Sequence, residues 1–374
     1  MTNEALLLVG DSVTDQDLYY KTHFLAGDPF VYAQLDGRSL LAVGAMELSR
    51  AEKESSVSEV RTFEELGYHE LLKEHGDRYR AYAQLLMKIV SAIGADAVRV
   101  SGEFRALHAD LLRESGLQVR VVPDLLLSDR RHKSAEEINA IEEAQRATER
   151  STARGIEILR ESDEVGGALV YRGVPLTSER LRSEIEGSLT RDGMDVSHTA
   201  IVASGPGAAD PHWQGEGPLR VDEPIVLDIF PRGRRGRYFA DMTRTVVRGR
   251  PAPILQKMYD AVLASQESAF AMIRPGANGS EIHQAVVDVL REAGFDREDG
   301  GPRYNHGTGH GVGLDIHERP GIGKHGDVLE EGDVVTVEPG LYHPEIGGIR
   351  IEDMVVVTAG GCRNLTRFPK EFVV

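Results

Sequence analysis

Residues 306–318 read His306-Gly-Thr-Gly-His310-Gly-Val-Gly-Leu-Asp-Ile-His317-Glu318. Glycine occupies alternate positions around His310, so little side-chain bulk surrounds this imidazole and the backbone can approach a ligand or cofactor closely. A histidine in such a setting fits a metal ligand better than a packed core residue. The stretch therefore predicts a ligand-binding histidine in a site lined by backbone.

Two aspartates upstream of this stretch flank a predicted β-hairpin. Asp228 and Asp241 have their midpoint between Arg234 and Arg235, and glycines stand on both sides of that pair. A two-residue turn at this point would place the two aspartates directly opposite each other on one face. Facing carboxylates repel each other unless a cation lies between them, so the hairpin predicts a metal.

Two glutamates downstream complete the candidate site. Glu338 and Glu352 lie in strand-like runs joined through Pro344 and a Gly-Gly pair, and their even separation implies an odd-numbered loop or a bulge. Four carboxylates balance two divalent cations, and a metal pair can activate water and polarise an unactivated amide. Ligation with a single histidine favours Mn²⁺, Co²⁺ or Fe²⁺ and admits Zn²⁺. The predicted ligands are Asp228, Asp241, His310, Glu338 and Glu352.

The chain is long enough, at 374 residues with 41% hydrophobic residues, for about two domains. We place the boundary at Leu127, giving domains 1–127 and 128–374. The first domain alternates apolar runs with helical patterns and is predicted to be α/β. Its predicted strands are 5–9, 30–34, 40–43, 97–101 and 119–122, and its predicted helix is 64–93.

The second domain has an α+β pattern, because its later strands are joined by short glycine-rich turns. A capping box, Ser134 with Glu137, precedes a helix that is predicted to reach about Arg160. The other predicted helices are 178–192, 254–274 and 280–294, and the predicted strands are 199–203, 224–230, 238–247, 333–337 and 349–357.

Composition excludes several classes of protein. Lys plus Arg number 43 and Asp plus Glu 60, so the net charge of −17 argues against a general nucleic-acid binder. Cys362 is the only cysteine, which rules out an intramolecular disulfide or a cysteine zinc cluster. The N-terminus lacks a basic region, and the most apolar helical stretch, 83–94, is too short for a membrane span. We expect a cytoplasmic protein that binds neither membrane nor nucleic acid.

Three motifs together resemble those of the pita-bread metallopeptidases, the group of aminopeptidase P, prolidase, methionine aminopeptidase and creatinase. They are His-Gly-x-Gly-His-Gly-x-Gly-x-x-x-His-Glu, Glu-Pro-Gly-x-Tyr and Arg-Ile-Glu-Asp. The resemblance covers nearly the whole chain, since the first domain is similar to a creatinase-type N-domain, and it is nearest to the aminopeptidase P and prolidase branch. It implies two divalent metal ions, with Mn²⁺ expected, hydrolysis of the X-Pro bond of short peptides by a dipeptidase or an aminopeptidase, and a homodimer formed through the N-domain.

The resemblance also implies roles for the ligands. Asp241 and Glu352 would bridge the two metals, and Glu338 would bind one metal and act as general base on the bridging water. His317 would hydrogen-bond the scissile carbonyl or its tetrahedral intermediate. Asp228 and Asp241 are two residues further apart than in the family pattern, and one added residue per strand would keep them opposed.

Four further residues complete the predicted site. His212 matches an upstream histidine that contacts substrate, and His306 matches another pocket histidine. Arg350 would orient the acidic ligands. Trp213, the only tryptophan, would either wall the substrate pocket or belong to the core or its rim. Ala240 replaces a commoner serine, which has no consequence that we can derive.

Three alternatives stay open. One arginine of the stretch Arg232-Gly-Arg-Arg-Gly-Arg237 could bind a substrate carboxylate, which would make the enzyme a dipeptidase or a carboxypeptidase; a solvated turn is the favoured interpretation. The fold could also serve a hydrolase without proline specificity, or a non-catalytic peptide-binding module. The intact ligand set counts against the module.

Overall fold

The structure is a computed structural model that describes residues 3–374. The described part of the chain divides into two compact units between Arg130 and Arg131. The predicted boundary, Leu127, is the first residue of helix α6 (Leu127–Arg131) at the end of the first unit. Among the described residues, no helix has both the length and the apolar character to cross a membrane.

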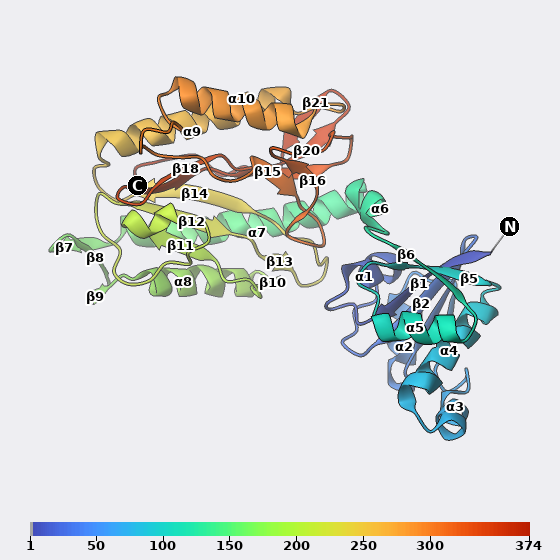
Figure 1. Cartoon of the computed structure of the whole chain (residues 1–374). Coiled ribbons are helices and arrows are strands. Elements are labelled where there is room, and N and C mark those ends of the chain that lie inside the picture. Colours follow the sequence, from blue (N-terminus) through green and yellow to red (C-terminus); the bar gives the residue numbers. More distant parts are fainter. Residues whose placement is uncertain (1–2) are drawn as a thin grey trace. The chain divides into compact units, whose positions relative to one another are not determined.

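The N-terminal unit is built on a six-stranded mixed sheet (Figure 1). Its strand order is β4-β3-β2-β1-β5-β6, with β1 antiparallel to β2 and parallel to β5. The five strands predicted from the apolar runs are confirmed. The strands are β1 (Glu4–Gly10), β2 (Phe30–Leu35), β3 (Arg38–Val43), β4 (Glu59–Thr62), β5 (Ala97–Ser101) and β6 (Gln118–Val122).

Helices cover both faces of this sheet because successive strand residues point to opposite sides. Leu7 and Val31 pack against residues of α4, whereas Leu6 and Phe30 pack on the other face with Leu18 of α1. The helices are α1 (Gln16–Thr22), η1 (Ala45–Glu47), α2 (Leu48–Glu54), α3 (Tyr68–His75), α4 (Arg78–Ala92) and α5 (Ala106–Glu114).

The single helix predicted over 64–93 is wrong, because the chain forms two helices there. Gly76 ends α3 in the left-handed conformation with φ 62°, and the Asp77 side chain accepts hydrogen bonds from the backbone N–H groups of Tyr79 and Arg80, the second and third residues of α4. A Gly-Asp pair is a helix stop followed by a helix start. Strand β4 was not predicted.

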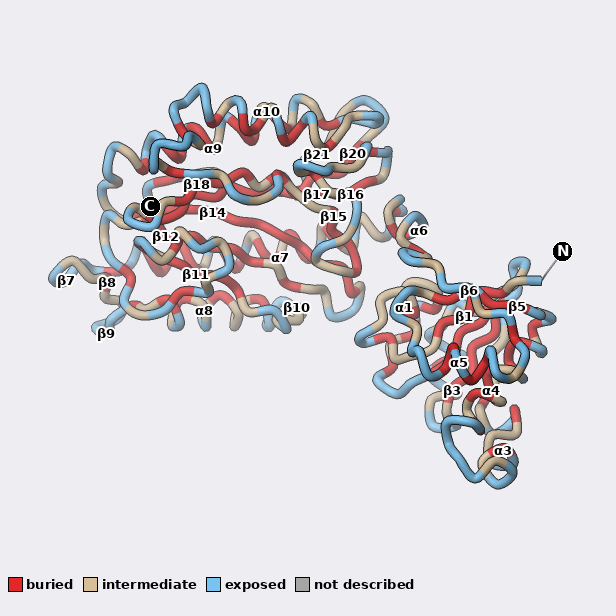
Figure 2. Tube along the Cα trace, viewed as in Figure 1, coloured by how far each residue is buried: buried red, intermediate tan, exposed pale blue. Residues whose placement is uncertain are grey.

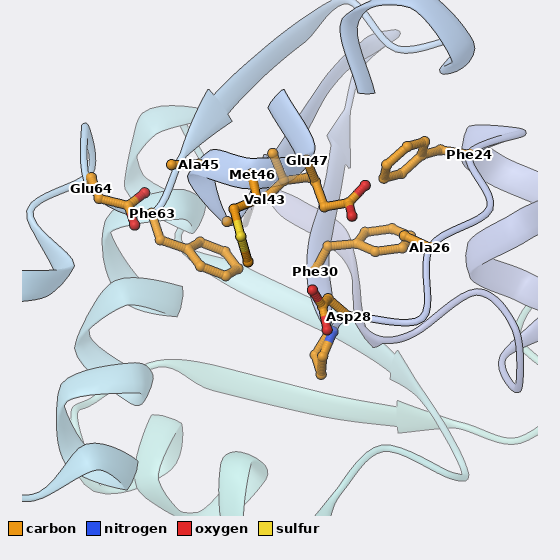
Figure 3. A pocket seen from close by; sticks show the side chains of 12 residues that line it. Phe24, Ala26, Asp28, Phe30, Val43, Ala45, Met46, Glu47, Phe63 and Glu64 are labelled. Atoms are coloured by element: carbon orange, nitrogen blue, oxygen red, sulfur yellow. The ribbon is translucent and has the colours of Figure 1, made fainter. Parts of the chain in front are cut away.

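A hollow of about 240 Å³ lies in the N-terminal unit, beside the short helix η1. Phe24, Phe30, Phe63 and Met46 are among the residues that line it, and acidic side chains, among them Glu47, lie at the same hollow (Figure 3). None of the predicted site residues lies there. The hollow is therefore separate from the candidate metal site, which belongs to the C-terminal unit.

The C-terminal unit places strands between two pairs of helices, α7 with α8 and α9 with α10 (Figure 1). The α+β prediction is confirmed, and so are the predicted helices to within two residues at each end. The capping box is present, since Ser134 and Glu137 each accept the other's backbone N–H. The helices are α7 (Ala135–Arg160), α8 (Ser178–Arg191), η2 (Gly205–Ala209), α9 (Pro253–Met272) and α10 (Gly279–Glu292).

The strands of this unit form two main sheets, β11-β12-β14 and β16-β15-β17-β20-β21. Every residue of β12 and β14 is buried, and both run through the interior between the helices (Figure 2). The strands are β7 (Asp163–Val165), β8 (Ala168–Tyr171), β9 (Val174–Pro175), β10 (Met194–Asp195), β11 (Ile201–Ser204), β12 (Pro224–Ile229), β13 (Arg232–Gly233), β14 (Met242–Val247), β15 (Gly309–Gly311), β16 (Glu318–Ile322), β17 (Val334–Val337), β18 (Gly340–His343), β19 (Gly347–Arg350), β20 (Asp353–Thr358) and β21 (Gly361–Asn364).

Candidate active site

The five predicted metal ligands lie at or next to strand ends of the C-terminal unit. Asp228 is near the end of β12 and Asp241 directly precedes β14. His310 is in β15, Glu338 directly follows β17, and Glu352 directly precedes β20. All five line one cavity of about 630 Å³.

The two aspartates share a face but are not directly opposite, so the predicted register of their hairpin is wrong. Asp228 pairs with Thr243, and the same register continues to a bridge between Arg232 and Phe239. The reason is the turn, which is a four-residue loop closed by Arg237 in the left-handed conformation (φ 65°). Asp241, two residues before Thr243, therefore lies diagonally from Asp228, on the same side of the ladder.

The two glutamates follow the predicted pattern. Strands β18 and β19 are joined by the three-residue loop 344–346, and Gly340 pairs with Arg350. Val337 pairs with Asp353 in the next ladder. Glu338 and Glu352 stand between these two ladders, in the same register, and thus oppose each other. The odd-numbered loop is confirmed.

The glycines around His310 serve the protein's own packing. A Cβ on Gly309 would lie 2.0 Å from the Thr336 carbonyl oxygen, and a Cβ on Gly311 would lie 2.4 Å from the Arg319 carbonyl oxygen. No side chain fits at such distances. These two glycines let β15 lie against its neighbours, where a close approach to a ligand or cofactor had been expected.

The donor set fits divalent metal ions. The Nδ1–H of His310 faces the Gly311 carbonyl at 3.1 Å, so the lone pair of Nε2 is directed at Glu338 Oε1 (3.3 Å) and Asp241 Oδ2 (3.7 Å). Ligand atoms of Asp241, His310 and Glu352 lie within 4.8 Å of one another. Oδ1 of Asp228 and Oδ1 of Asp241 are buried with no hydrogen-bond partner. A lone pair and two orphaned buried carboxylate oxygens in one cavity are ligand atoms suited to a cation.

Burial and mutual repulsion perturb this cluster strongly. Burial, reinforced by Glu352 and Asp228, raises the pKa of Asp241 well above its usual range. Burial, reinforced by Glu338 and Asp228, does the same to the pKa of Glu352. Burial also raises the pKa of Glu338. Such shifts at the floor of a cavity are typical of a functional site.

A chain of hydrogen bonds extends from Asp228 to His306. Arg350 donates from Nη2 to Asp228 Oδ2 (2.6 Å) and from Nη1 to the Tyr342 hydroxyl (3.0 Å). The Tyr342 hydroxyl is 2.8 Å from Nε2 of His306, whose Nδ1 is 2.8 Å from the Gly307 carbonyl. Arg350, buried with Asp228, thus holds one carboxylate oxygen and leaves the other for a metal.

The remaining histidines lie in the same cavity. His317 packs edge-on against His310 with ring centroids 4.3 Å apart, and burial lowers its pKa. His212 lines the cavity with the apolar residues Pro211 and Phe230. The catalytic cavity therefore combines acidic ligands, imidazoles and an apolar wall.

Trp213 and the arginine-rich turn do not line this cavity. The indole of Trp213 packs over Gly207 and against an apolar cluster that includes Ile201 and Ala203. Arg232 forms an ion pair with Asp195 (2.7 Å), and its guanidinium lies over the Phe239 ring. The turn at Arg232–Arg237 is therefore not positioned to bind a substrate carboxylate in the cavity.

Two residues that position the predicted metal ligands were not predicted from the sequence. The Thr243 hydroxyl donates to Glu352 Oε2 (2.7 Å), and Tyr342 connects Arg350 to His306. Both carried a signal. Thr243 lies two residues after Asp241, on the same strand face, and Tyr342 is the tyrosine of the Glu-Pro-Gly-x-Tyr motif.

The fold and the site define a metal-dependent hydrolase of the pita-bread class, with carboxylate-rich ligation at strand ends between two helix pairs. Residues 139–359, more than half of the chain, match the description "Metallopeptidase family M24". The chain belongs to this metallopeptidase family.

Comparison with individual proteins gives the same assignment. The chain is 34% identical over 244 residues to the uncharacterized peptidase YqhT of Bacillus subtilis, covering 65% of this chain and 64% of that one. It is 30% identical over 259 residues to the Xaa-Pro dipeptidase of Pyrococcus horikoshii, covering 68% of each. It superimposes on the X-Pro aminopeptidase of Thermotoga maritima with a TM-score of 0.81 at 25% identity, over 99% of this chain and 97% of that one. The alignments thus span about two thirds of these sequence relatives.

Proposed function

We propose that this protein is a dinuclear metal-dependent exopeptidase that hydrolyses the X-Pro bond of short peptides. The observation that carries the proposal is that Asp228, Asp241, His310, Glu338 and Glu352 line one cavity, where two of their buried carboxylate oxygens have no hydrogen-bond partner within the described residues. The relatives named Xaa-Pro dipeptidase and X-Pro aminopeptidase support the proline specificity.

The five ligands would hold two divalent ions, which when bound would activate water and polarise the scissile carbonyl. Glu338, raised in pKa by burial, is suited to accept a proton from the attacking water and to return it to the leaving amine. His317, kept neutral by burial, can donate one N–H to the negative charge that develops on the carbonyl oxygen. His212 contacts the substrate from the Pro211 side of the cavity.

Three further assignments belong to the same proposal. Mn²⁺ is the proposed physiological ion, because one imidazole among four carboxylates is a hard donor set; Co²⁺, Fe²⁺ and Zn²⁺ are the alternatives. The protein is proposed to act in the cytoplasm as a homodimer. The N-terminal unit is proposed to mediate this dimer and to restrict access of longer substrates.

A peptide panel tests the proposal. Metal-stripped protein resupplied with Mn²⁺ is assayed on Ala-Pro, Ala-Pro-Ala, Ala-Pro-Ala-amide and Ala-Ala-Ala, with Glu338→Gln as control. Cleavage of the dipeptide alone identifies a dipeptidase, and release of alanine from the tripeptides containing proline identifies an aminopeptidase. Trimming of Ala-Ala-Ala alone refutes the proline specificity, and release of the C-terminal residue identifies a carboxypeptidase. Failure to bind metal or to hydrolyse any peptide would favour a non-catalytic peptide-binding module.

A further inference from the structure

A second cavity, of about 710 Å³, adjoins the catalytic cavity in the C-terminal unit. The two cavities share the stretch Asn305–Gly307 as part of their lining, so His306 contacts both. One face of helix α10 forms a further wall, because Ser280, His283 and Arg291 recur at helical spacing. This cavity contains none of the five metal ligands.

The second cavity is basic, although the protein carries a net charge of −17. Arg291, Arg303 and Lys324 line it, and Asp296 is the one carboxylate among its lining residues. Asp296 lies between the two guanidinium groups, 3.3 Å from Arg291 and 3.7 Å from Arg303, and accepts the Tyr304 backbone N–H. One carboxylate therefore holds two arginines in place and leaves a local excess of positive charge.

Two of the lining groups have unused hydrogen-bonding capacity. Lys324 has no ion-pair partner within the described residues 3–374. His283 is only 5% exposed, and its Nδ1 is 2.9 Å from the Thr308 hydroxyl, while no described residue hydrogen-bonds its Nε2. The free ammonium group of Lys324 is a donor without an acceptor, and Nε2 of His283 adds a polar atom with hydrogen-bonding capacity at the same cavity.

The two cavities differ in the basic side chains that they offer to a carboxylate of the substrate. Arg350 is the single Arg or Lys among the described residues that line the catalytic cavity, and its guanidinium is occupied by Asp228, Tyr342 and Thr243. Lys324, past His306, is therefore the one lysine or arginine without an ion-pair partner among the described residues that line the two cavities.

We propose that the basic cavity is a carboxylate subsite for the part of the peptide that follows the scissile bond, with Arg303 and Lys324 as its binding residues. The inference rests on the proposed peptidase function and narrows its substrates to peptides with an acidic side chain or a free C-terminus beyond proline.

The test compares the isosteric peptides Ala-Pro-Asp-amide and Ala-Pro-Asn-amide at low ionic strength. We expect kcat/KM to favour the Asp peptide by about 3- to 10-fold, mostly through KM, as for partly exposed ion pairs. Arg303→Gln and Lys324→Gln should each reduce the preference without slowing the Asn peptide, and Lys324→Glu should shift it toward Ala-Pro-Lys-amide. Arg274→Gln, an exposed arginine outside the cavity, is the matched control.

Two further experiments distinguish a failure of the proposed subsite from a failure of the proposed function. Inorganic phosphate should compete with the Asp peptide only, because only this peptide would use the basic cavity; equal inhibition of both peptides would mean that phosphate acts elsewhere and that the cavity does not bind the Asp carboxylate, which refutes the subsite. Equal turnover of the Asp and Asn peptides also refutes it and leaves the proposed function intact. If no peptide is hydrolysed, the proposed function fails, and calorimetric binding of both peptides to Glu338→Gln protein still tests the Asp preference.

Discussion

The ion pair between Lys133 and Glu318 should be one of the most costly contacts to break in the C-terminal unit. The two side chains are 0% and 3% exposed, and they join the segment just before α7 to the residue that follows His317. Removal of one partner of a buried ion pair typically costs about 3–5 kcal/mol, because the remaining charge stays buried without its counter-charge in that pair. We therefore expect Lys133→Met to destabilise this unit by about that amount, a shift of roughly 1–2 M in the urea midpoint at an m-value of about 2.5–3 kcal/mol/M.

Trp213 makes this measurement specific, because the only tryptophan of the chain lies in the C-terminal unit. Urea unfolding followed by its fluorescence reports this unit alone. Arg160→Gln is the matched control at the other end of α7, since the pair of Arg160 with Glu371 is 53% and 56% exposed and should cost at most about 1 kcal/mol. The double variant Lys133→Met/Glu318→Gln should lose less than the sum of the two single variants. Additive losses, or a cost for Lys133→Met as small as the control's, would refute the reasoning.

Three shorter predictions follow. Glu338→Gln should lower the hydrolysis rate by about 10²- to 10⁴-fold or more, with an unchanged circular-dichroism spectrum; near-normal turnover would exclude Glu338 as the base. Because burial raises the pKa of Asp241 and Glu352, the folded metal-free protein binds more protons than the unfolded chain. Its melting temperature should therefore fall as pH rises above the usual carboxylate range, and Glu352→Gln should weaken this pH dependence. If the melting temperatures of the two proteins depend on pH in the same way, repulsion between these buried carboxylates is not the cause. Arg232→Gln should leave the ratio of the hydrolysis rates on Ala-Pro-Ala and its amide unchanged, because Arg232 is paired with Asp195. A loss of rate on the free acid alone would show that the arginine-rich turn binds the substrate carboxylate.

Local patterns predicted the elements that carry the site. Apolar runs predicted the buried strands, and the capping box at Ser134 predicted the start of α7. The even spacing of Glu338 and Glu352 predicted the odd-numbered loop between their strands. Each of these features depends on residues that are close together in the sequence, which is where pattern and spacing are informative.

The remaining features depend on contacts that no local pattern records. The register of Asp228 and Asp241 is set by a four-residue turn whose base is docked by the ion pair of Arg232 with Asp195. The pair of Lys133 with Glu318 joins residues 185 positions apart. Such contacts form only when the two helix pairs close around the strands.

The hydrogen-bond chain that ends at His306 has a fixed direction. Because the Arg350 guanidinium can only donate, the Tyr342 hydroxyl is free to donate to Nε2 of His306, while the Nδ1–H of the same ring is occupied by the Gly307 carbonyl. Neither nitrogen of this neutral imidazole is left for a bound molecule. A group that contacts His306 from the cavity would meet the carbon edge or the face of the ring, so we expect this histidine to present an aromatic surface to a ligand.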